Sequence, residues 1–195
     1  MKTYICFIRH GETSWNKEGR IQGLIDNLLS DNGVNEAKVL ASNLKEIDPR
    51  WDIIVTSPLT RAKQTALIIK EGLNIDIPLI IEDNLTERNF GEAEGVIISK
   101  DLFSRILNDD ITGLEKSIHL QNRVHEATIK IAKENPGKKI LIVAHSHVIK
   151  ALLIKLDNKY TYKQQVKNLS LNKFVYQFDK LLIDEININI NKKDI

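Results

Sequence analysis

Three separated apolar segments, each followed by basic side chains, constrain how this sequence can fold. The segments are rich in β-branched residues, which predicts buried strands, and they span residues 2–8, 51–56 and 139–144. The basic side chains that follow are Arg9 and His10, then Arg61 within about one helical turn, then His145. If the strands are parallel and adjacent, their carboxyl ends form one crevice of the kind that binds ligands in α/β proteins. The pattern therefore predicts a pocket for an acidic ligand.

The first of these strand ends, residues 9–13, contains side chains suited to chemistry. Arg9 offers a planar fork that matches phosphate or carboxylate. His10 can act as a base, an acid or a nucleophile near neutral pH. Taken alone, an arginine next to a histidine fits an ordinary exposed loop equally well. The recurrence of basic groups at the other strand ends favours a functional site.

The composition is that of an ordinary globular protein. The chain has 195 residues, 42% of them hydrophobic and 28% charged, which suffices for one domain with a core. A net charge of +2 is too small to argue for nucleic acid or a membrane surface as a partner. The single cysteine, Cys6, excludes an intrachain disulfide and is expected to be a buried thiol. We see no signal-peptide pattern and no apolar stretch of bilayer length, so we expect a cytoplasmic protein.

Helices and strands alternate along the chain, which predicts one α/β domain over residues 1–195. Expected helices span residues 30–47, 59–71, 117–134 and 148–156. Ser30 and Ser57 are the expected helix caps and Gly72 a helix stop. We further expect an edge strand at 75–81 and a hairpin of strands 173–178 and 181–190, with frayed residues at 191–195. Residues 14–30 read as a functional loop. Residues 96–116 read as a small helical insertion, built from 96–107 and 108–116, over the pocket.

Four motifs occur in order and resemble those of the histidine phosphatase superfamily, which includes phosphoglycerate mutases and many small-molecule phosphatases. They are R-H-G-E-T at 9–13 with Asn16 after it, S-P-L-x-R-A-x-Q-T at 57–65, L-x-E-R-N-F-G-x-x-E-G at 85–95, and V-A-H at 143–145. The resemblance covers residues 1 to about 154. It implies a three-layer α/β/α sandwich around a mixed, mostly parallel sheet.

The resemblance also implies a role for each matching residue. His10 attacks phosphorus and becomes a phosphohistidine, while Arg9, Arg61 and a protonated His145 neutralise the phosphate. Glu87 protonates the leaving group and then activates water. Further contacts to the substrate are expected from Asn16, Gln22, Gly23 and Ser146. No metal and no cofactor are required, because the side chains supply the positive charge.

Several alternatives remain open from sequence. Glu12, Glu92 or Glu94 could hold the acid role, because loop carboxylates cannot be ranked without geometry. Asn16 and Gln22 could have only a structural role in a turn. His145 could be a buried core residue without a role in the site, and Arg61 could be a solvent-facing surface residue. A metal site for the histidines is the other chemistry to consider, although the close spacing of metal ligands is missing.

The function also has alternatives: a phosphatase, a cofactor-dependent phosphoglycerate mutase, or a phosphate-binding module without turnover. Two features favour the phosphatase. Glu94 stands where mutases carry a glutamine, and would repel an acidic sugar phosphate, and the insertion at 96–116 is short. The expected partner is a small phosphate ester, whose identity the sequence does not give. The sequence leaves a homodimer open.

Overall fold

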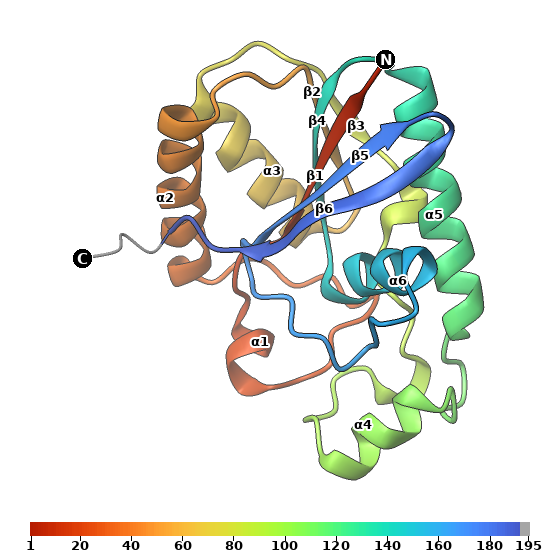
Figure 1. Cartoon of the computed structure of the whole chain (residues 1–195). Helices are drawn as coiled ribbons and strands as arrows, with labels where there is room; N and C mark the ends of the chain where they lie inside the picture. The colour runs from red at the N-terminus through yellow and green to blue at the C-terminus, as the bar shows by residue number, and fades with distance from the viewer. Residues whose placement is uncertain (192–195) are drawn as a thin grey trace.

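The computed structural model describes residues 1–191 of the chain. Within this range, six strands form one mixed sheet in the order β3-β2-β4-β1-β5-β6 (Figure 1). The strands are β1 (Thr3–Arg9), β2 (Ile53–Thr56), β3 (Leu79–Ile81), β4 (Lys139–Ala144), β5 (Leu171–Gln177) and β6 (Lys180–Ile188). The four strands β1 to β4 run parallel, and β5 and β6 are antiparallel to their neighbours. The mixed, mostly parallel sheet is therefore confirmed, with β3 at an edge as expected.

Helices cover both faces of the sheet and complete three layers. Helices α2 (Asp31–Ile47) and α3 (Thr60–Leu73) pack on one face, and α5 (Ser117–Glu134) and α6 (Ser146–Leu156) pack on the other. Neighbouring side chains of β1 alternate between the layers: Phe7 belongs to the core beneath α5 and α6, and Ile8 to the core beneath α2 and α3. A strand buried on both faces needs a continuous apolar run, which is what the sequence shows.

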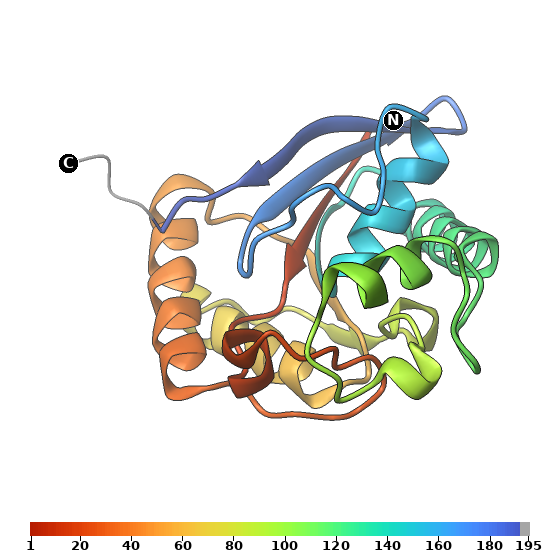
Figure 2. The same cartoon turned by 90° about the horizontal axis from the view of Figure 1, so that it is seen from below.

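The parallel register brings three strand ends to one level. Arg9 pairs with Ala144, and Thr56 pairs with Val143. The ladder continues for one hydrogen bond past each strand, because the N–H of His10 donates to the Ala144 carbonyl and that of Ser57 to the Val143 carbonyl, both at 3.0 Å. Two short helices, α1 (Ser14–Glu18) and α4 (Lys100–Leu107), lie beyond this end of the sheet (Figures 1 and 2).

The expected boundaries of α3 were wrong at both ends. The helix begins at Thr60 and its N-cap is Leu59, while the Ser57 hydroxyl accepts from the Leu59 N–H at 3.3 Å and lies 2.7 Å from Nε2 of His145. The helix continues through Gly72 to Leu73, and its C-cap, Asn74, takes the left-handed conformation. A Cβ on Gly72 would lie 2.5 Å from the Cβ of Ala41, so this glycine permits the close approach of α2 and α3. Helix α6 likewise begins two residues earlier than expected, at Ser146.

The insertion at 96–116 contains one helix, α4, where two had been expected. Residues 108–116 form turns, with Asp109 and Gly113 at positive φ. The Asp109 carboxylate accepts hydrogen bonds from the backbone and hydroxyl of Ser117 and from Arg88. Aspartate and glycine favour such turns over helix, because the side chain competes for backbone partners and glycine loses more entropy in a helix. The helix expected within 96–107 is therefore confirmed as α4, and the one expected at 108–116 was wrong.

Two further differences are local. The expected loop at 14–30 contains α1, which a capping box between Thr13 and Asn16 begins. The hairpin turn lies at Phe178 and Asp179, both at positive φ, one residue before the expected turn. The expected fraying of 191–195 falls mostly outside the described residues, although the Asn191 side chain donates to the Glu36 carbonyl. Cys6 is buried as expected, and burial raises the pKa of its thiol to about 12.

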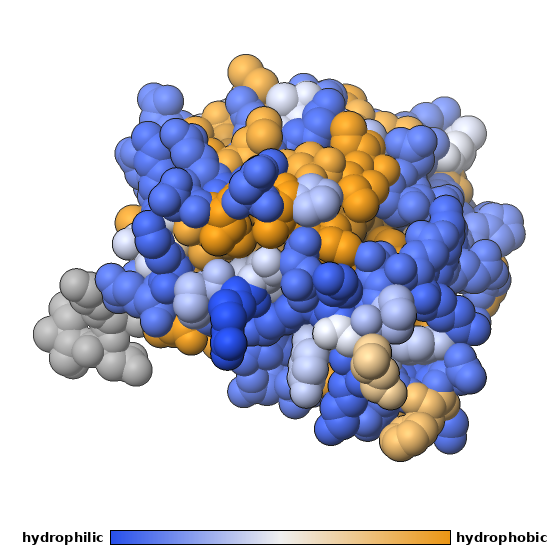
Figure 3. All heavy atoms as spheres, turned by 90° about the horizontal axis from the view of Figure 1, so that it is seen from above, coloured by the Kyte–Doolittle hydropathy of each residue, from blue (hydrophilic) through white to orange (hydrophobic). Residues whose placement is uncertain are grey.

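The end of the molecule remote from α1 and α4 shows a patch of apolar side chains surrounded by hydrophilic ones (Figure 3). Exposed apolar side chains elsewhere include those of Val96, Ile97 and Ile98, on the insertion. Among residues 1–191, no helix has both the length and the apolar composition needed to cross a membrane. Outside this patch, single exposed apolar groups are normal on protein surfaces.

The start of α2 packs directly on the backbone that follows β1. A Cβ on Gly33 would lie 2.2 Å from the carbonyl oxygen of Glu12 and 2.8 Å from its nitrogen. Gly33→Ala should therefore lower the free energy of unfolding by ~1–3 kcal/mol, as overpacking does, although alanine normally stabilises a helix. Urea denaturation measures this change. The control is Asn35→Ala, at an exposed position of the same helix; equal stabilisation by both substitutions would contradict the prediction.

Candidate active site

A cavity of about 240 Å³ lies at the carboxyl ends of β1, β2 and β4. Eight of the nine residues that the sequence placed in a site line it: Arg9, His10, Asn16, Gln22, Gly23, Arg61, Glu87 and Ser146. The ninth, His145, lies directly behind, with its ring 5.2 Å from that of His10 between centroids. The structure therefore brings together residues from four separate regions of the chain: 9–23, 61, 87 and 145–146.

His10 is held in one tautomer by the backbone. Its side chain is 3% exposed, and its Nδ1 lies 2.7 Å from the carbonyl oxygen of Gly11. A carbonyl oxygen can only accept, so Nδ1 carries the hydrogen and Nε2 keeps its lone pair. Burial, followed by the charges of Arg61 and Arg9, holds the pKa of His10 well below its usual value. His10 is therefore neutral near pH 7, with Nε2 as its nucleophilic atom.

His145 is fully buried and bonded to the end of β2. Its Nε2 lies 2.7 Å from the hydroxyl oxygen of Ser57. Burial, followed by the charges of Arg61, His10 and Arg9, holds the pKa of His145 well below its usual value. The protein's own charges thus favour a neutral His145, contrary to the expectation of a protonated one. A dianionic phosphate next to the ring would act in the opposite direction and favour protonation.

The two arginines are anchored by backbone carbonyls. Nη1 of Arg9 donates to Val166 at 2.7 Å. Arg61 donates to Gly23 at 2.8 Å and to Ile25 at 2.9 Å, and its side chain is 1% exposed, so a surface role for it is excluded. Burial lowers the pKa of Arg9 to about 10, with Glu87 opposing and Arg61 adding to the shift, so the guanidinium stays charged at pH 7. Within residues 1–191, neither guanidinium has an acidic hydrogen-bond partner, and two cations held in this way suit a phosphate.

Glu87 is 7% exposed and is fixed from two sides. Its Oε1 accepts from the N–H of Arg88 at 2.9 Å, and its Oε2 from that of His147 at 3.3 Å. Arg123 holds the preceding loop by donating to the carbonyls of Asn84, Thr86 and Glu87 at 2.6, 2.8 and 3.3 Å. The carboxyl group therefore faces the cavity in a position that other residues determine.

The other candidate carboxylates do not line the cavity. Glu12 accepts from the hydroxyl of Ser30 at 2.9 Å, and Glu92 is exposed. Oε1 of Glu94 accepts from the N–H groups of Leu24 and Phe90, at 2.9 and 3.0 Å. Glu94 thus ties together two loops, and the expectation that it meets and repels a substrate is not supported by its position.

The remaining predicted residues form the wall beside His10. The Oδ1 of Asn16 accepts from the N–H of Thr13 and from Nδ2 of Asn168, both at 3.3 Å. Gln22 is 7% exposed. Gly23 has φ +56° and packs against Glu94, whose Oε1 would lie 1.9 Å from a Cβ at that position. Asn16 and Gly23 therefore help to fix the conformation of the loop after β1, and both also line the cavity.

Sequence reasoning missed several residues of the site. Ser57 was assigned to a helix cap. Asn168 donates to the His10 carbonyl at 2.8 Å from a loop for which no motif was recognised. Four apolar side chains, those of Phe90, Ile98, Phe103 and Ile106, form an apolar part of the cavity wall. Lys150 also lines the cavity, and could have been found because it lies one helical turn after Ser146 and His147.

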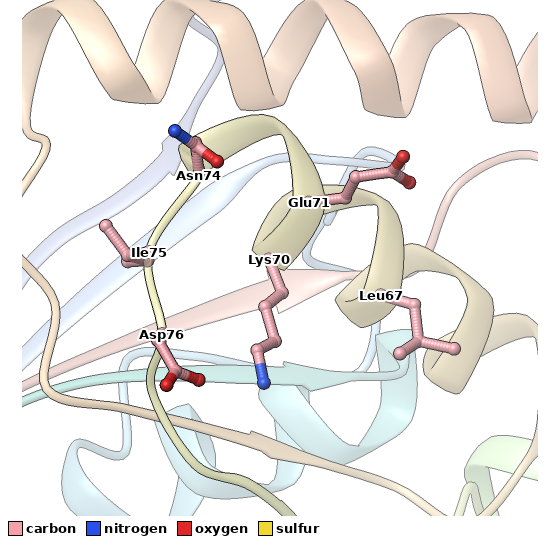
Figure 4. Close-up of a pocket in the computed structure, with 6 residues that line it drawn as sticks. All are labelled: Leu67, Lys70, Glu71, Asn74, Ile75 and Asp76. Carbon is pink, nitrogen blue, oxygen red and sulfur yellow. The ribbon is translucent and has the colours of Figure 1, made fainter.

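A second hollow, of about 560 Å³, lies at the far end of α3 (Figure 4). Leu67, Lys70 and Glu71 of the helix and Asn74, Ile75 and Asp76 after it line this open hollow. Of the residues that the structure describes, no histidine or arginine lines it, in contrast to the smaller cavity, which His10, Arg9 and Arg61 line. Among residues 1–191, no three His, Cys, Asp or Glu side chains are grouped so as to hold a metal ion.

Comparison with known proteins agrees with this arrangement. The family model of the histidine phosphatase superfamily (branch 1) matches residues 5–189. The uncharacterized phosphatase PhoE of Bacillus subtilis (strain 168) is 35% identical over 189 residues, which cover 96% of this chain and 95% of that protein. The metal-independent phosphoserine phosphatase of Arabidopsis thaliana is 31% identical over 194 residues, covering 93% and 80%. A 2,3-bisphosphoglycerate-dependent phosphoglycerate mutase of Methylobacterium sp. (strain 4-46) is 30% identical over 176 residues, covering 83% and 84%.

Solved structures show the same fold. A mutant phosphoserine phosphatase from Entamoeba histolytica, in complex with phosphoserine, superimposes with a TM-score of 0.83 at 26% identity, covering 97% of this chain and 98% of that one. Similarity in sequence and in structure thus extends over nearly the whole chain, including the segments that build the cavity. The chain belongs to the histidine phosphatase superfamily, a family of enzymes.

Proposed function

We propose that this enzyme is a metal-independent phosphomonoesterase that hydrolyses a small phosphorylated metabolite through a phosphohistidine on His10. The observation that carries the proposal is the state of His10: buried, neutral, and fixed by the Gly11 carbonyl so that Nε2 is available. Arg9 and Arg61 flank it as charged groups whose backbone bonds leave further N–H donors for a phosphoryl group. A nucleophile within a cationic clamp is what phosphoryl transfer requires.

Hydrolysis proceeds in two steps on this arrangement. The phosphoryl oxygens bind the arginines, which reduces the repulsion that a nucleophile meets, and His145 stabilises the charge on the far side. Nε2 of His10 attacks phosphorus while Glu87 donates a proton to the leaving oxygen. In the second step Glu87 takes a proton from water, which attacks the phosphohistidine and releases inorganic phosphate. Ser57 orients His145, and the Gly11 carbonyl keeps the hydrogen on Nδ1 of His10.

Two relatives support a small ester as the substrate. The Arabidopsis relative is named a metal-independent phosphoserine phosphatase, and the Entamoeba structure contains phosphoserine. The cavity volume of about 240 Å³ is below the range usual for drug-sized ligands, so it suits a small organic group next to the phosphoryl group.

A phosphoglycerate mutase is the second candidate, because the Methylobacterium relative carries that name. A mutase must exclude water from its phosphohistidine until transfer is complete. The cover here contains a single helix of eight residues, α4. A small cover of this kind favours access of water and therefore hydrolysis over transfer.

The ratio of hydrolysis to transfer tests the proposal. With 3-phosphoglycerate and a catalytic amount of 2,3-bisphosphoglycerate, we expect free phosphate to form faster than 2-phosphoglycerate, because water reaches the intermediate. Both products are measured in one time course, and a panel of other phosphomonoesters is assayed for phosphate release. Interconversion faster than the best phosphate release from any ester would show that the enzyme is a mutase.

The acid role of Glu87 has a separate test. Glu87→Gln should slow hydrolysis of esters with poor leaving groups by ~10²–10⁴-fold, because the leaving alkoxide then receives no proton. Aryl phosphates with activated leaving groups need less protonation and should lose much less. Steady-state kcat on both ester types measures the difference, with Glu92→Gln, at an exposed position outside the cavity, as the matched control. Equal losses on the two ester types would assign the acid role to another group.

A further inference from the structure

The cavity contains one cation more than the proposed reaction uses. The charged side chains that line it are Arg9, Arg20, Arg61, Lys150 and Glu87. Arg20 is paired with Glu18 at 2.6 Å. If the two site arginines balance a phosphoryl dianion and Glu87 enters the reaction protonated, the charge of Lys150 has no counterpart on the protein.

Lys150 projects into the cavity from the second turn of α6. It lies on the same helical face as Ser146 and His147, which also line the cavity. The ring of His147 stacks on Tyr162 and meets the edge of Phe90, which fixes it as a flat wall beside the lysine. The ammonium group is half-buried and, within residues 1–191, has no hydrogen-bond or ion-pair partner.

The surroundings of Lys150 are unfavourable to an isolated cation. Burial, followed by the charge of Arg9, lowers the pKa of its ammonium group to about 8, against the opposing charge of Glu87. Arg9 comes from β1, Glu87 from the loop before α4, and His147 from the same helix. Partly buried charges are normally paired, because desolvation without a counter-ion costs free energy. An anionic ligand group next to Lys150 would supply the missing pairing.

We propose that Lys150 binds a carboxylate of the substrate, so that the preferred substrates are small phosphomonoesters carrying a carboxylate group. A single ammonium balances the single charge of a carboxylate, whereas a second phosphoryl group would bring more charge than one lysine can balance. The small cavity also favours a carboxylate, the smaller group, beside the apolar wall of Phe90, Ile98, Phe103 and Ile106. The proposal rests on the phosphatase function above and gives it a substrate class.

Two esters that differ only in this group provide the test. 3-Phosphoglycerate carries a carboxylate where glycerol 3-phosphate carries a hydroxymethyl group. Lys150→Met removes the charge and keeps most of the side-chain length. It should lower kcat/KM for 3-phosphoglycerate by ~10- to 100-fold, mainly through KM, as the loss of a charged hydrogen bond does. The value for glycerol 3-phosphate should change by less than ~3-fold, and Lys150→Arg should retain the preference for the acid.

The pH dependence of the preference gives a second readout. The ratio of kcat/KM for the two esters cancels the contributions of groups that act on both substrates alike, such as His10 and the two site arginines. Lys150 is a cation below its pKa, so the ratio should be highest at pH 7 and fall as the pH rises through about 8. In Lys150→Met the ratio should be low and flat. Lys155→Met, on the exposed surface of the same helix, is the control and should behave as the wild type.

Binding measured in the His10→Ala background separates this proposal from the proposed function. Calorimetry should show a Kd for 3-phosphoglycerate at least ~10-fold weaker after Lys150→Met is added, with the Kd for glycerol 3-phosphate unchanged. A wild-type enzyme that hydrolyses no ester would contradict the phosphatase function, whatever the binding data show. Equal changes for the two esters, or no change for either, would overturn the role of Lys150 and leave the phosphatase function intact.

Discussion

The parallel hydrogen-bond ladder that joins β2, β4 and β1 is the constraint on which the site depends. Its register sets Arg9 beside Ala144 and Thr56 beside Val143, so that His10, Ser57 and His145 emerge at one level. The helices on both faces keep the ladder in register, because a slip by one residue would reverse the burial of every side chain in the central strands. The relative positions of the site residues are therefore set by the packing of the core.

The buried and half-buried arginines around the site are of two kinds, distinguished by whether their charge is paired with a carboxylate. Arg88 pairs with Asp109, and Arg123 with Glu115, so their charges are balanced within the protein. Arg9 and Arg61 instead bond to carbonyl groups, which orient a guanidinium without cancelling its charge. Their uncancelled charge, after burial itself, holds the pKa of His10 low. The two charges that suit a phosphate thus also keep His10 neutral.

The order of strands and helices and most of the cavity-lining residues could be predicted from the sequence. The hydrogen bonds that orient those residues could not. Buried strands and amphipathic helices can be predicted from the local spacing of apolar residues. Arg9, His10 and His145 follow two of these predicted strands directly, so their position at the end of the sheet could also be predicted. The contacts of Ser57 with His145 and of Asn168 with His10 join distant segments, so no local pattern reveals them. A helix was expected at 108–116, but Asp109 and Gly113 there adopt positive φ and form turns. The protonation state of His145 depends on burial and neighbouring charges, which appear only in the fold.

We propose that His10 acts through Nε2 because the Gly11 carbonyl holds the hydrogen on Nδ1. Rapid quench with a radiolabelled phosphomonoester, after dialysis against a chelator, tests it most directly. We expect the enzyme to carry an acid-labile, base-stable label, which NMR of the phosphorylated ring should locate on Nε2 of His10. The label should be absent in His10→Ala. Label that persists at the wild-type level in His10→Ala, or that lies on Nδ1, would contradict the account.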